Sequence, residues 1–460
     1  METVAVFDVG KTNVKLVAVT KAGELLDSLS RSNPVYPAPP YSHHDLGLLE
    51  MWLLENLRSL GARYAIEAIV ATGHGSGGVL VGQDGPLMPM IDYEQEPPAE
   101  IARDYPRLAG SFRERGSPCM LASAHLAKQM LWLERAWSLE FAAAKAYLAH
   151  PQYWAWRLSG VMASEVTNLA AQSHLWCTPD RRLSKLADDR GWGRLIPPLA
   201  SAWATLGTLK PELAHRTGLS ENTRILTGIH DSSANLYRYQ RAGFRDFTVV
   251  STGTWIALIC DRAGLRADIE QPGLCCNADV FGAPLHGMLV MGGREFSAIA
   301  DGFTGPASRK SLDALISTRT MALPSFGTDD CLFPGSSRNG KIVGALSQSA
   351  EVRFTLAVLY AALLTNCCLD GLATSAVVLD GSFVRDPLYG AIVAALRPER
   401  SVHINRETFG TVTGAALLAT HAAVTAPRPL SLERPLPIDN SDLIAYARQW
   451  REQATTGRAS

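Results

Sequence analysis

Two short apolar runs open the chain, with a small polar segment between them. Residues 4–7 and 14–19 are apolar and rich in valine, and residues 8–13 read Asp-Val-Gly-Lys-Thr-Asn. Two β-prone runs joined by a turn of this composition are typical of a β-hairpin. Residues 25–30 are expected to add a third antiparallel strand. The pattern therefore predicts a three-stranded meander at the start of the chain.

The spacing of apolar residues changes after residue 45. Between residues 46 and 60 they recur at the spacing of one helix face, and residues 66–71, which are apolar except for Glu67, are typical of a buried strand. From residue 124 to residue 150 the pattern is mostly helical, and it continues over residues 147–158. Residues 442–451 are expected to form a surface helix.

Three of the expected strands run directly into polar or glycine-rich segments. They are residues 66–71 before the glycine-rich segment 72–78, residues 225–229 before His230 and Asp231, and residues 376–380 before Gly381 and Ser382. Loops at the C-terminal ends of strands are a common place for a ligand in α/β folds. Helices are expected to follow over residues 232–239 and 389–396. Residues 410–419 are expected to begin as a Gly/Thr loop and to become a helix.

A second strand–turn–strand pattern repeats the opening one. Residues 247–250 are apolar, residues 251–254 read Ser-Thr-Gly-Thr, and residues 255–260 form another strand-like run. Two such hairpins in separate halves indicate a duplicated domain that holds a polyphosphate between its halves. A chain of 460 residues is also expected to form two domains. We place them at residues 1–240 and 241–460.

Composition narrows the class of protein. The chain is 47% hydrophobic and 19% charged, as expected of a globular protein, and its formal net charge is -1. This charge provides no electrostatic attraction for nucleic acid or an anionic membrane. Apolar runs fall short of the roughly 18 residues that a spanning helix needs, and the N-terminus shows no charged-then-apolar leader. Eight cysteines without CxxC or metal-binding spacing favour reduced thiols, so we expect a cytoplasmic protein.

The first polar turn carries groups suited to a phosphorylated ligand. Gly10 lets the backbone approach a ligand closely, and Lys11, Thr12 and the turn N–H groups can donate to phosphate oxygens. Asp8 is placed to hold Mg²⁺ through water. Taken alone, the segment is equally consistent with an ordinary hairpin turn. Lys11 is equally consistent with a phosphate contact and with a solvated lysine.

Three further polar residues are candidates for an acceptor site. His74 and Asp92 are suited to bind the hydroxyls of a polar substrate, although each alone is also consistent with a loop residue satisfied by backbone or water. Asp231 is suited to act as a general base, which must lie within about 3 Å of the proton it removes. The alternative role for Asp231 is a helix N-cap, and the two roles are compatible.

Taken in order, these segments resemble the FGGY carbohydrate kinases, within the actin/hexokinase/heat-shock-protein ATPase superfamily. The resemblance runs over nearly the whole chain and rests on residues 8–13, 228–231, 251–255, 380–382 and 410–419. Residues 157–160 and 165–176 also resemble the family's segment before the first domain closes. The Ser-Thr-Gly-Thr-Trp turn is most similar to the rhamnulokinase and fuculokinase branch.

The resemblance implies an α/β fold of two ribonuclease-H-like domains, an actin-like duplication, around a deep catalytic cleft. It implies that ATP and Mg²⁺ bind in the cleft and that a sugar hydroxyl is phosphorylated, in a ketose such as L-fuculose, L-rhamnulose or a ketopentose, with Asp231 as the general base. The implied ATP and phosphate contacts are Gly10, Lys11, Thr12, Asn13, Thr252, Gly253, Thr254, Gly381, Ser382 and Gly414. The implied acceptor contacts are His74, Gly75, Asp92 and Asp231, and the implied metal contacts are Asp8 and Asp231.

Two positions depart from the family pattern. Glu94 stands where the family often has arginine, which affects the sugar pocket more than the chemistry, and Lys11 stands where many members have a small residue. A second hypothesis is a nucleotide- and sugar-binding regulator that has lost turnover. The joint presence of Asp231 and both phosphate turns argues against it, as does the lack of a DNA-binding motif. The expected partners are a sugar and ATP, without nucleic acid or membrane, and a homodimer is left open.

Overall fold

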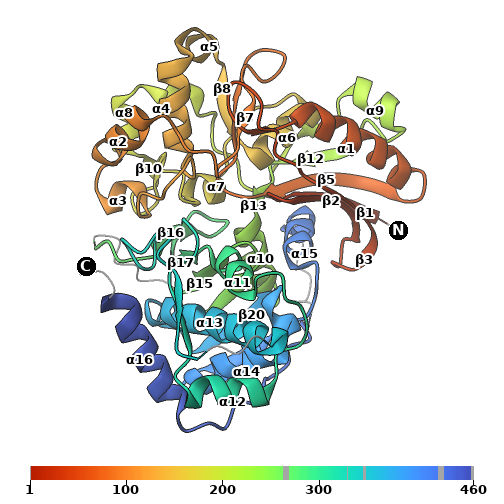
Figure 1. The fold of residues 1–460 in the computed structure, drawn as a ribbon. Helices are drawn as coiled ribbons and strands as arrows, with labels where there is room; N and C mark the ends of the chain where they lie inside the picture. Colours follow the sequence, from red (N-terminus) through yellow and green to blue (C-terminus); the bar gives the residue numbers. More distant parts are fainter. Residues whose placement is uncertain (1, 263–268, 329, 346–348, 423–428, 457–460) are drawn as a thin grey trace.

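The computed structural model describes residues 2–262, 269–328, 330–345, 349–422 and 429–456. The described chain forms two α/β units, drawn one above the other in Figure 1, and each unit is built around a mixed sheet. Helices α10 (Asp231–Arg241) and α15 (Gly410–Ala416) lie between the two units. The α/β duplication expected from the two hairpins is therefore present.

The first sheet contains seven described strands in the order β11-β12-β5-β1-β2-β3, with β13 also paired to β5. These strands are β1 (Glu2–Val9), β2 (Asn13–Thr20), β3 (Leu25–Ser32), β5 (Ala65–Gly73), β11 (Thr205–Thr208), β12 (Arg224–Leu226) and β13 (Ile229–His230). Strands β1, β2 and β3 form the predicted antiparallel meander, and β5 lies parallel to β1. Val4, Val6 and Phe7 are fully buried, as expected of a strand that is covered on both faces.

Helix α1 (Leu46–Gly61) covers part of this sheet and matches the helix predicted over residues 46–60. It begins after Asp45, whose carboxylate accepts a hydrogen bond from the Leu48 N–H at 2.9 Å. The remaining elements of the first unit are β4 (His43–His44), β6 (Gly78–Val81), β7 (Met90–Ile91), α2 (Ala99–Leu108), α3 (Phe112–Arg115), α4 (Leu126–Ala136), α5 (Ser138–Ala143), β8 (Ala146–Ala149), α6 (His150–Ser159), α7 (Val166–Ala170), β9 (Trp176–Cys177), β10 (Arg182–Leu183), α8 (Lys185–Asp189) and α9 (Pro211–Thr217).

The helical pattern predicted over residues 124–158 is wrong in its middle part. Helices α4 and α5 are followed by the strand β8, and helix α6 begins only at His150. Strand β8 pairs with β6, whose residues lie about 70 positions earlier in the chain. Tertiary pairing therefore overrides the local helical spacing of Tyr147 and Leu148.

The second sheet repeats the pairing pattern of the first. Its strands run in the order β16-β17-β15-β14-β20-β21. They are β14 (Phe247–Thr252), β15 (Ile256–Cys260), β16 (Leu274–Ala278), β17 (Pro284–Val290), β20 (Ala376–Gly381) and β21 (Ser401–Ile404). As β1 does with β2 and β5, β14 pairs antiparallel with β15 and parallel with β20. The second strand of this hairpin begins at Ile256, one residue later than predicted.

The second sheet is covered by helices α11 (Gly292–Ala300), α12 (Arg309–Ser317), α13 (Ala350–Asp370), α14 (Pro387–Leu396) and α16 (Leu443–Thr456), with a small sheet of β18 (Met321–Leu323) and β19 (Lys341–Val343). By length and composition α13 could cross a membrane, but 78% of its apolar window is buried inside the protein. The predicted surface helix near the C-terminus, α16, buries Tyr446 and Trp450 in the core of this unit. One face of that helix is therefore not at the surface.

Helix α15 joins the two units. It packs against α10 and also against β1 and β5 of the first sheet, although it lies late in the chain. The Gly/Thr loop predicted at its start is already helical, because the helix begins at Gly410. Gly410 and Gly414 both face α10: a Cβ on Gly414 would stand 1.8 Å from the Ala234 carbonyl oxygen. These glycines allow two helices to cross closely between the sheets.

Candidate active site

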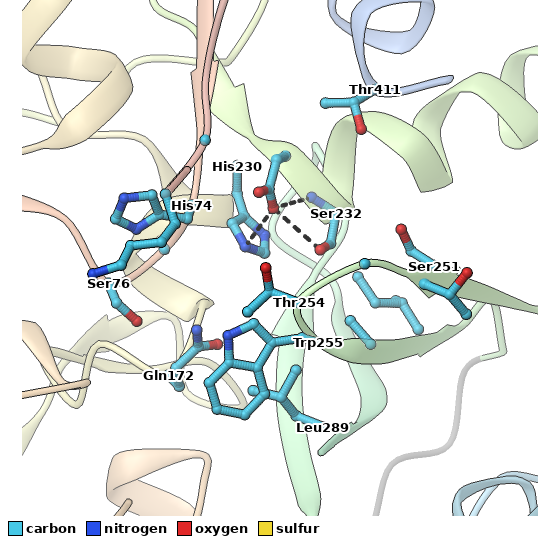
Figure 2. Close-up of a pocket in the computed structure, with 18 of the residues that line it drawn as sticks. His74, Ser76, Gln172, His230, Ser232, Ser251, Thr254, Trp255, Leu289 and Thr411 are labelled. Carbon is cyan, nitrogen blue, oxygen red and sulfur yellow. Dashed lines mark hydrogen bonds and ion pairs between the residues drawn. The ribbon is translucent and has the colours of Figure 1, made fainter. Parts of the chain in front are cut away.

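A cavity of about 340 Å³ lies between the two sheets. Its walls are the β1–β2 turn, the loop after β5, the start of α10 and the β14–β15 turn. Of the residues predicted from sequence, it is lined by Asp8, Gly10, Lys11, Thr12, Asn13, His74, Gly75, Asp231, Thr252, Gly253 and Thr254. Figure 2 shows His74, Ser76 and Gln172 on one side of the cavity, Ser251 on the other, and His230, Ser232 and Thr254 between them. Segments far apart in the sequence thus meet at one site.

Asp231 is the first residue of α10, directly after the short strand β13. Its Oδ1 accepts hydrogen bonds from the Ser232 backbone N–H at 2.5 Å and from the Ser232 hydroxyl at 3.1 Å. The Nε2 of His230 lies 3.2 Å from the same oxygen (dashed lines in Figure 2). The N-cap of α10 is His230, one residue earlier, so the prediction that Asp231 is the N-cap is wrong. The side chain is 32% exposed toward the cavity.

His230 is buried beneath Asp231 and supports it. Burial lowers the pKa of His230, so the ring is neutral near pH 7, although Asp231 opposes this shift. Its Nδ1 lies 3.2 Å from the Ser233 hydroxyl. If Ser233 donates to Nδ1, the proton of the neutral ring is on Nε2 and points at the carboxylate of Asp231. His230 therefore fixes the orientation of Asp231 without adding a positive charge.

Asp8 is the second carboxylate of the site and lies at the end of β1. Burial raises the pKa of Asp8 to about 6, partly offset by Lys15, whose Nζ lies 3.9 Å from Oδ2, and reinforced by the charge of Asp231. A buried carboxylate near a second carboxylate favours a divalent cation between them, because carboxylate oxygens are the ligands that Mg²⁺ prefers. Asp8 and Asp231 therefore fit the metal role expected of them.

The first turn is closed by its own backbone. The Gly10 N–H donates to the Asn13 carbonyl at 3.0 Å, and the Asn33 side chain donates to the Gly10 carbonyl at 2.9 Å. A Cβ on Gly10 would stand 2.9 Å from the Asn13 carbonyl oxygen, so glycine is needed for this tight turn. The turn holds Thr12 and Asn13 at the cavity wall.

Lys11 is not the solvated turn lysine that was one of the two alternatives drawn from the sequence, and its contact with phosphate stays a prediction. Its side chain is only 9% exposed, which excludes a solvated turn lysine, and its ammonium pairs with the carboxylate of Asp92. The ammonium also lies 4.8 Å from the centre of the Tyr93 ring. The side chain thus points away from the turn toward the loop that was expected to bind the sugar. Asp92 does not line the cavity, because its carboxylate faces Lys11.

His74 and its neighbours offer hydrogen-bonding groups to the cavity. Neither ring nitrogen of His74 has a partner among the described residues, and burial holds its pKa well below the usual range, so the ring is neutral. The ring packs edge-on against Tyr93, with centroids 5.3 Å apart. Gly75 follows it, where a Cβ would stand 2.5 Å from the Cβ of Ala171. The loop after β5 therefore brings an unpaired, neutral imidazole to the cavity.

In the second turn, the side chain of Thr252 forms hydrogen bonds within the protein. Its hydroxyl donates to the Asp380 carbonyl at 2.7 Å and accepts from the Phe383 N–H at 3.0 Å. The Thr252 hydroxyl therefore joins β14 to the turn after β20, and the phosphate contact expected of Thr252 stays a prediction. Gly253 and Thr254 remain exposed to the cavity. Gly381, with φ of 93°, has its backbone against Thr252, where a Cβ would stand 2.1 Å from the Thr252 carbonyl oxygen.

Two further cavities adjoin the first. One, of about 500 Å³, is lined by Asp8, Gly381, Ser382 and Gly410, among others. The other, of about 360 Å³, is lined by Gly253, Ser382 and the rings of Phe296 and Phe383, whose centroids are 5.1 Å apart. Gly414 lines none of these three cavities, contrary to its expected place in an adenosine pocket. It is buried at the crossing of α10 and α15 instead.

Several residues of the site were not predicted. Gln172 and Ser76 line the cavity beside His74, and Tyr93 and Trp255 meet across it, with the indole N–H 3.4 Å from the tyrosine oxygen. Gln172 has a φ of 44°, an unusual conformation for a non-glycine residue that is common at functional sites. Gln172 lies in the segment 165–176 that resembles the family, but its place in the site was not predicted, because its backbone conformation and its neighbours arise only from folding.

Comparisons with known proteins agree with this architecture. Residues 3–237 match the N-terminal domain of the FGGY family of carbohydrate kinases, and residues 244–427 match the FGGY carbohydrate kinase C-terminal domain. The L-fuculokinases of Salmonella typhi and Escherichia coli strain K12 are both 24% identical to this chain, over 291 and 290 residues. Those matches cover 60% of this chain and 61% of each relative, so the chain spans less than two thirds of the curated relatives it matches.

Solved structures show the same fold. A carbohydrate kinase from Novosphingobium aromaticivorans has a TM-score of 0.84 at 29% identity, with 99% of both chains covered. A xylulose kinase from Lactobacillus acidophilus has a TM-score of 0.80 at 16% identity, with 99% of this chain and 97% of that chain covered. The predicted two-domain, actin-like architecture is therefore confirmed. Because one family model covers more than half of the chain and the second continues it, the chain belongs to the FGGY family of carbohydrate kinases.

Proposed function

We propose that this protein is an ATP-dependent sugar kinase with Asp231 as its general base. The acceptor is a ketose such as L-fuculose, L-rhamnulose or a ketopentose. The observation that carries the proposal is that Asp231 opens onto a cavity that both glycine- and threonine-containing turns also line. The L-fuculokinases among the relatives support a ketose, and the resemblance of the second turn to the fuculokinase branch agrees with them.

In this mechanism the sugar lies between Asp231 and the loop of His74. The Asp231 carboxylate accepts the proton of a sugar hydroxyl, and that oxygen attacks the γ-phosphorus of ATP in line. Ser232 and His230 hold Oδ1 of Asp231 so that its carboxylate faces the acceptor. The Gly10 and Gly253 N–H groups donate to the Asn13 and Trp255 carbonyls within their own turns. The other backbone N–H groups, at Lys11, Thr12 and Thr254, would bind the transferring phosphoryl group from both sides.

Mg²⁺ is assigned to Asp8 and Asp231. When bound, it would neutralise charge on the phosphate oxygens during transfer. Asp8 requires its ionised form for this role, and its pKa of about 6 leaves it mostly ionised at pH 7.5. Lys15, close to Asp8, adds positive charge on the same side of the cavity.

We place the nucleotide base in the apolar cavity beside the second turn. Phe296 and Phe383 offer flat faces on which a purine can lie, and Gly253 and Ser382 connect this cavity to the phosphate side. Gly381 and Ser382 would approach the ribose and phosphates through backbone. The domain boundary proposed at residue 240 agrees with the gap between the two family matches, which end at residue 237 and begin at residue 244.

The decisive experiment measures ADP release with a coupled assay in the presence of ATP, Mg²⁺ and a panel of L- and D-ketoses. Release that depends on a ketose supports the kinase. ATP hydrolysis that is indifferent to every sugar would contradict it. Tight sugar binding without turnover would favour the alternative, a catalytically silent nucleotide- and sugar-binding regulator of the same fold.

A further inference from the structure

The side chain of Lys11 leaves the phosphate turn and enters the acceptor side of the cavity. Its ammonium is held by the Asp92 carboxylate and by the face of the Tyr93 ring, and the Lys11 and Asp92 side chains are 9% and 8% exposed. A lysine so held has its charge compensated before any phosphate arrives. The placement therefore argues against Lys11 as a phosphate ligand and requires another role for a buried cation.

The ammonium of Lys11 has donors to spare. It carries three N–H groups, and Asp92 is the one hydrogen-bond acceptor that the described residues provide for it. Lys11 lines the cavity together with the unpaired ring of His74, the Ser76 hydroxyl and the Gln172 amide. These groups form a wall of fixed donors and acceptors opposite Asp231, as a ligand with several hydroxyls requires.

The charges around this wall cancel. Lys11 is paired with Asp92, and Glu94, two residues further on, is paired with Arg294 of α11 at 3.1 Å. Lys15 and Asp8, which also line the cavity, lie 3.9 Å apart and offset each other. The Asp231 carboxylate, held by Ser232 and the neutral ring of His230, then remains as a negative charge facing the acceptor. A carboxylate on the acceptor would be repelled by the charge of Asp231, whereas a neutral hydroxyl would not be repelled.

We propose that Lys11 and Asp92 form a charge-compensated pair that sets acceptor specificity, in which the ammonium donates to acceptor hydroxyls and Asp92 cancels its charge, so that a neutral polyhydroxyl compound is selected over a sugar acid. The inference rests on the proposed kinase function and refines its substrate class. It makes Lys11 a residue of the sugar site although it lies within the phosphate turn. It also gives Asp92 a specificity role without direct contact with the cavity.

The first test is the Asp92→Asn variant, which leaves the ammonium of Lys11 uncompensated while keeping the size of the side chain. Steady-state kinetics are measured with the preferred neutral ketose and with an aldonic acid of the same carbon number. We expect the ratio of kcat/KM for the acid to that for the ketose to rise by at least about tenfold, because a free cation now faces the acceptor. An unchanged ratio in a folded variant would overturn the proposal, since a purely structural pair would not alter charge preference.

The second test separates the sugar from the phosphate. In Lys11→Met we expect KM for the sugar to rise at least about tenfold, with KM for ATP within about twofold of the original value, because the lost donors face the acceptor. A rise in KM for ATP alone would return Lys11 to the phosphate site. Lys11→Met leaves the buried carboxylate of Asp92 without its partner, which can destabilise the fold. The double variant Lys11→Met/Asp92→Leu removes both charges and so avoids an unpaired buried charge. The double variant should show the same loss for the sugar.

A matched control is Lys21→Met. Lys21 follows the other end of β2, pairs with Glu2 and Glu67, and lies outside the cavity. The same chemical change there should leave both KM values unaltered. If Lys21→Met raises KM for the sugar as much as Lys11→Met does, the effect is not specific and the proposal fails.

Calorimetric titration of the sugar without nucleotide distinguishes this inference from the proposed function. If the wild-type protein binds a neutral sugar but releases no ADP, the kinase proposal fails. The inference then stands provided that Lys11→Met weakens that binding. Equal binding by the two proteins overturns the inference even if the kinase activity is established. Absence of binding to any neutral sugar in the panel overturns both.

Discussion

At the scale of single residues, the two oxygens of Asp231 are in different situations. Ser232 and His230 hold Oδ1, whereas no donor among the described residues reaches Oδ2. Behind them, the Thr167 hydroxyl accepts from the backbone N–H of His230 at 3.1 Å and donates to the Glu165 carboxylate at 2.6 Å. One oxygen of Asp231 is thus fixed by hydrogen bonds, and in the proposed mechanism the other accepts a proton from the acceptor.

The substitution Asp231→Asn tests this assignment. The amide keeps the size of the side chain but cannot accept a proton at neutral pH. We expect kcat for sugar-dependent ADP release to fall by roughly two to four orders of magnitude, the range for loss of a general base. The melting temperature and sugar affinity are measured in parallel. Near-normal turnover by a folded Asp231→Asn protein would exclude Asp231 as the base.

At the scale of elements, closely packed backbones position the site. The two turns face each other because β1 and β14 occupy equivalent places in their sheets. The helix that carries Asp231 is fixed from behind by α15, with Gly414 at the crossing. The position of Asp231 therefore depends on a residue that lies outside the cavity.

Substitution of Gly414 by alanine tests this dependence. A Cβ would stand 1.8 Å from a backbone oxygen of α10, so the helices must separate. We expect the free energy of unfolding to fall by about 1–3 kcal/mol, the usual cost of overpacking a core, or by more. Denaturant titration measures the change, and kcat should also fall because Asp231 shifts. Gly85→Ala is the control, because a Cβ there meets no atom within 4 Å. If both variants unfold alike, the crossing does not constrain α10.

At the scale of the whole molecule, the two units are joined across the cavity. Glu94 pairs with Arg294, the Trp255 indole reaches Tyr93, and the Cys276 N–H donates to the Gly116 carbonyl at 2.6 Å. Closure of the units over the cavity would exclude water from the phosphoryl group. The first unit also buries neutral histidines, which link the stability of the fold to pH.

His150 provides the clearest case. Burial lowers its pKa to about 3 from an ordinary 6.5, and neither ring nitrogen has a partner among the described residues. A histidine whose pKa is depressed by folding stabilises the protein above pH 6.5 and loses that contribution as the pH falls toward 3. Its share of the unfolding free energy should fall by about 1.4 kcal/mol per pH unit below 6.5.

Urea unfolding at pH 7.5, 6.5, 5.5 and 4.5 measures this dependence. In His150→Gln the unfolding free energy should fall less steeply below pH 6.5, by about 1.4 kcal/mol per pH unit. The reason is that the unfolded chain has lost one group that binds a proton. His215 is exposed on α9, and His215→Gln should leave the slope unchanged. Parallel curves for the wild-type protein and His150→Gln would contradict the assignment.

Much of the fold followed from local patterns. Valine-rich runs around Asp8 and around Thr252 predicted both hairpins, because alternation and turn composition act over a few residues. The residues Gly10, Thr12, His74, Gly253 and Asp231 were predicted at a ligand site and lie on one cavity. Their roles toward ATP, sugar and Mg²⁺ stay predictions, as do the cytoplasmic location, the domain boundary and the homodimer.

The sequence by itself determined which segments become strands and which turns carry ligand-binding groups, since these depend on neighbours in the chain. Only the tertiary structure decided which residues the long side chains contact and which backbone segments pack closely together. Lys11 turns toward Asp92, 81 positions away, and Gly414 packs against α10 rather than lining a cavity. Strand β8 forms because β6 lies beside it. Such contacts depend on the relative positions of distant segments, which hydrophobic spacing does not encode.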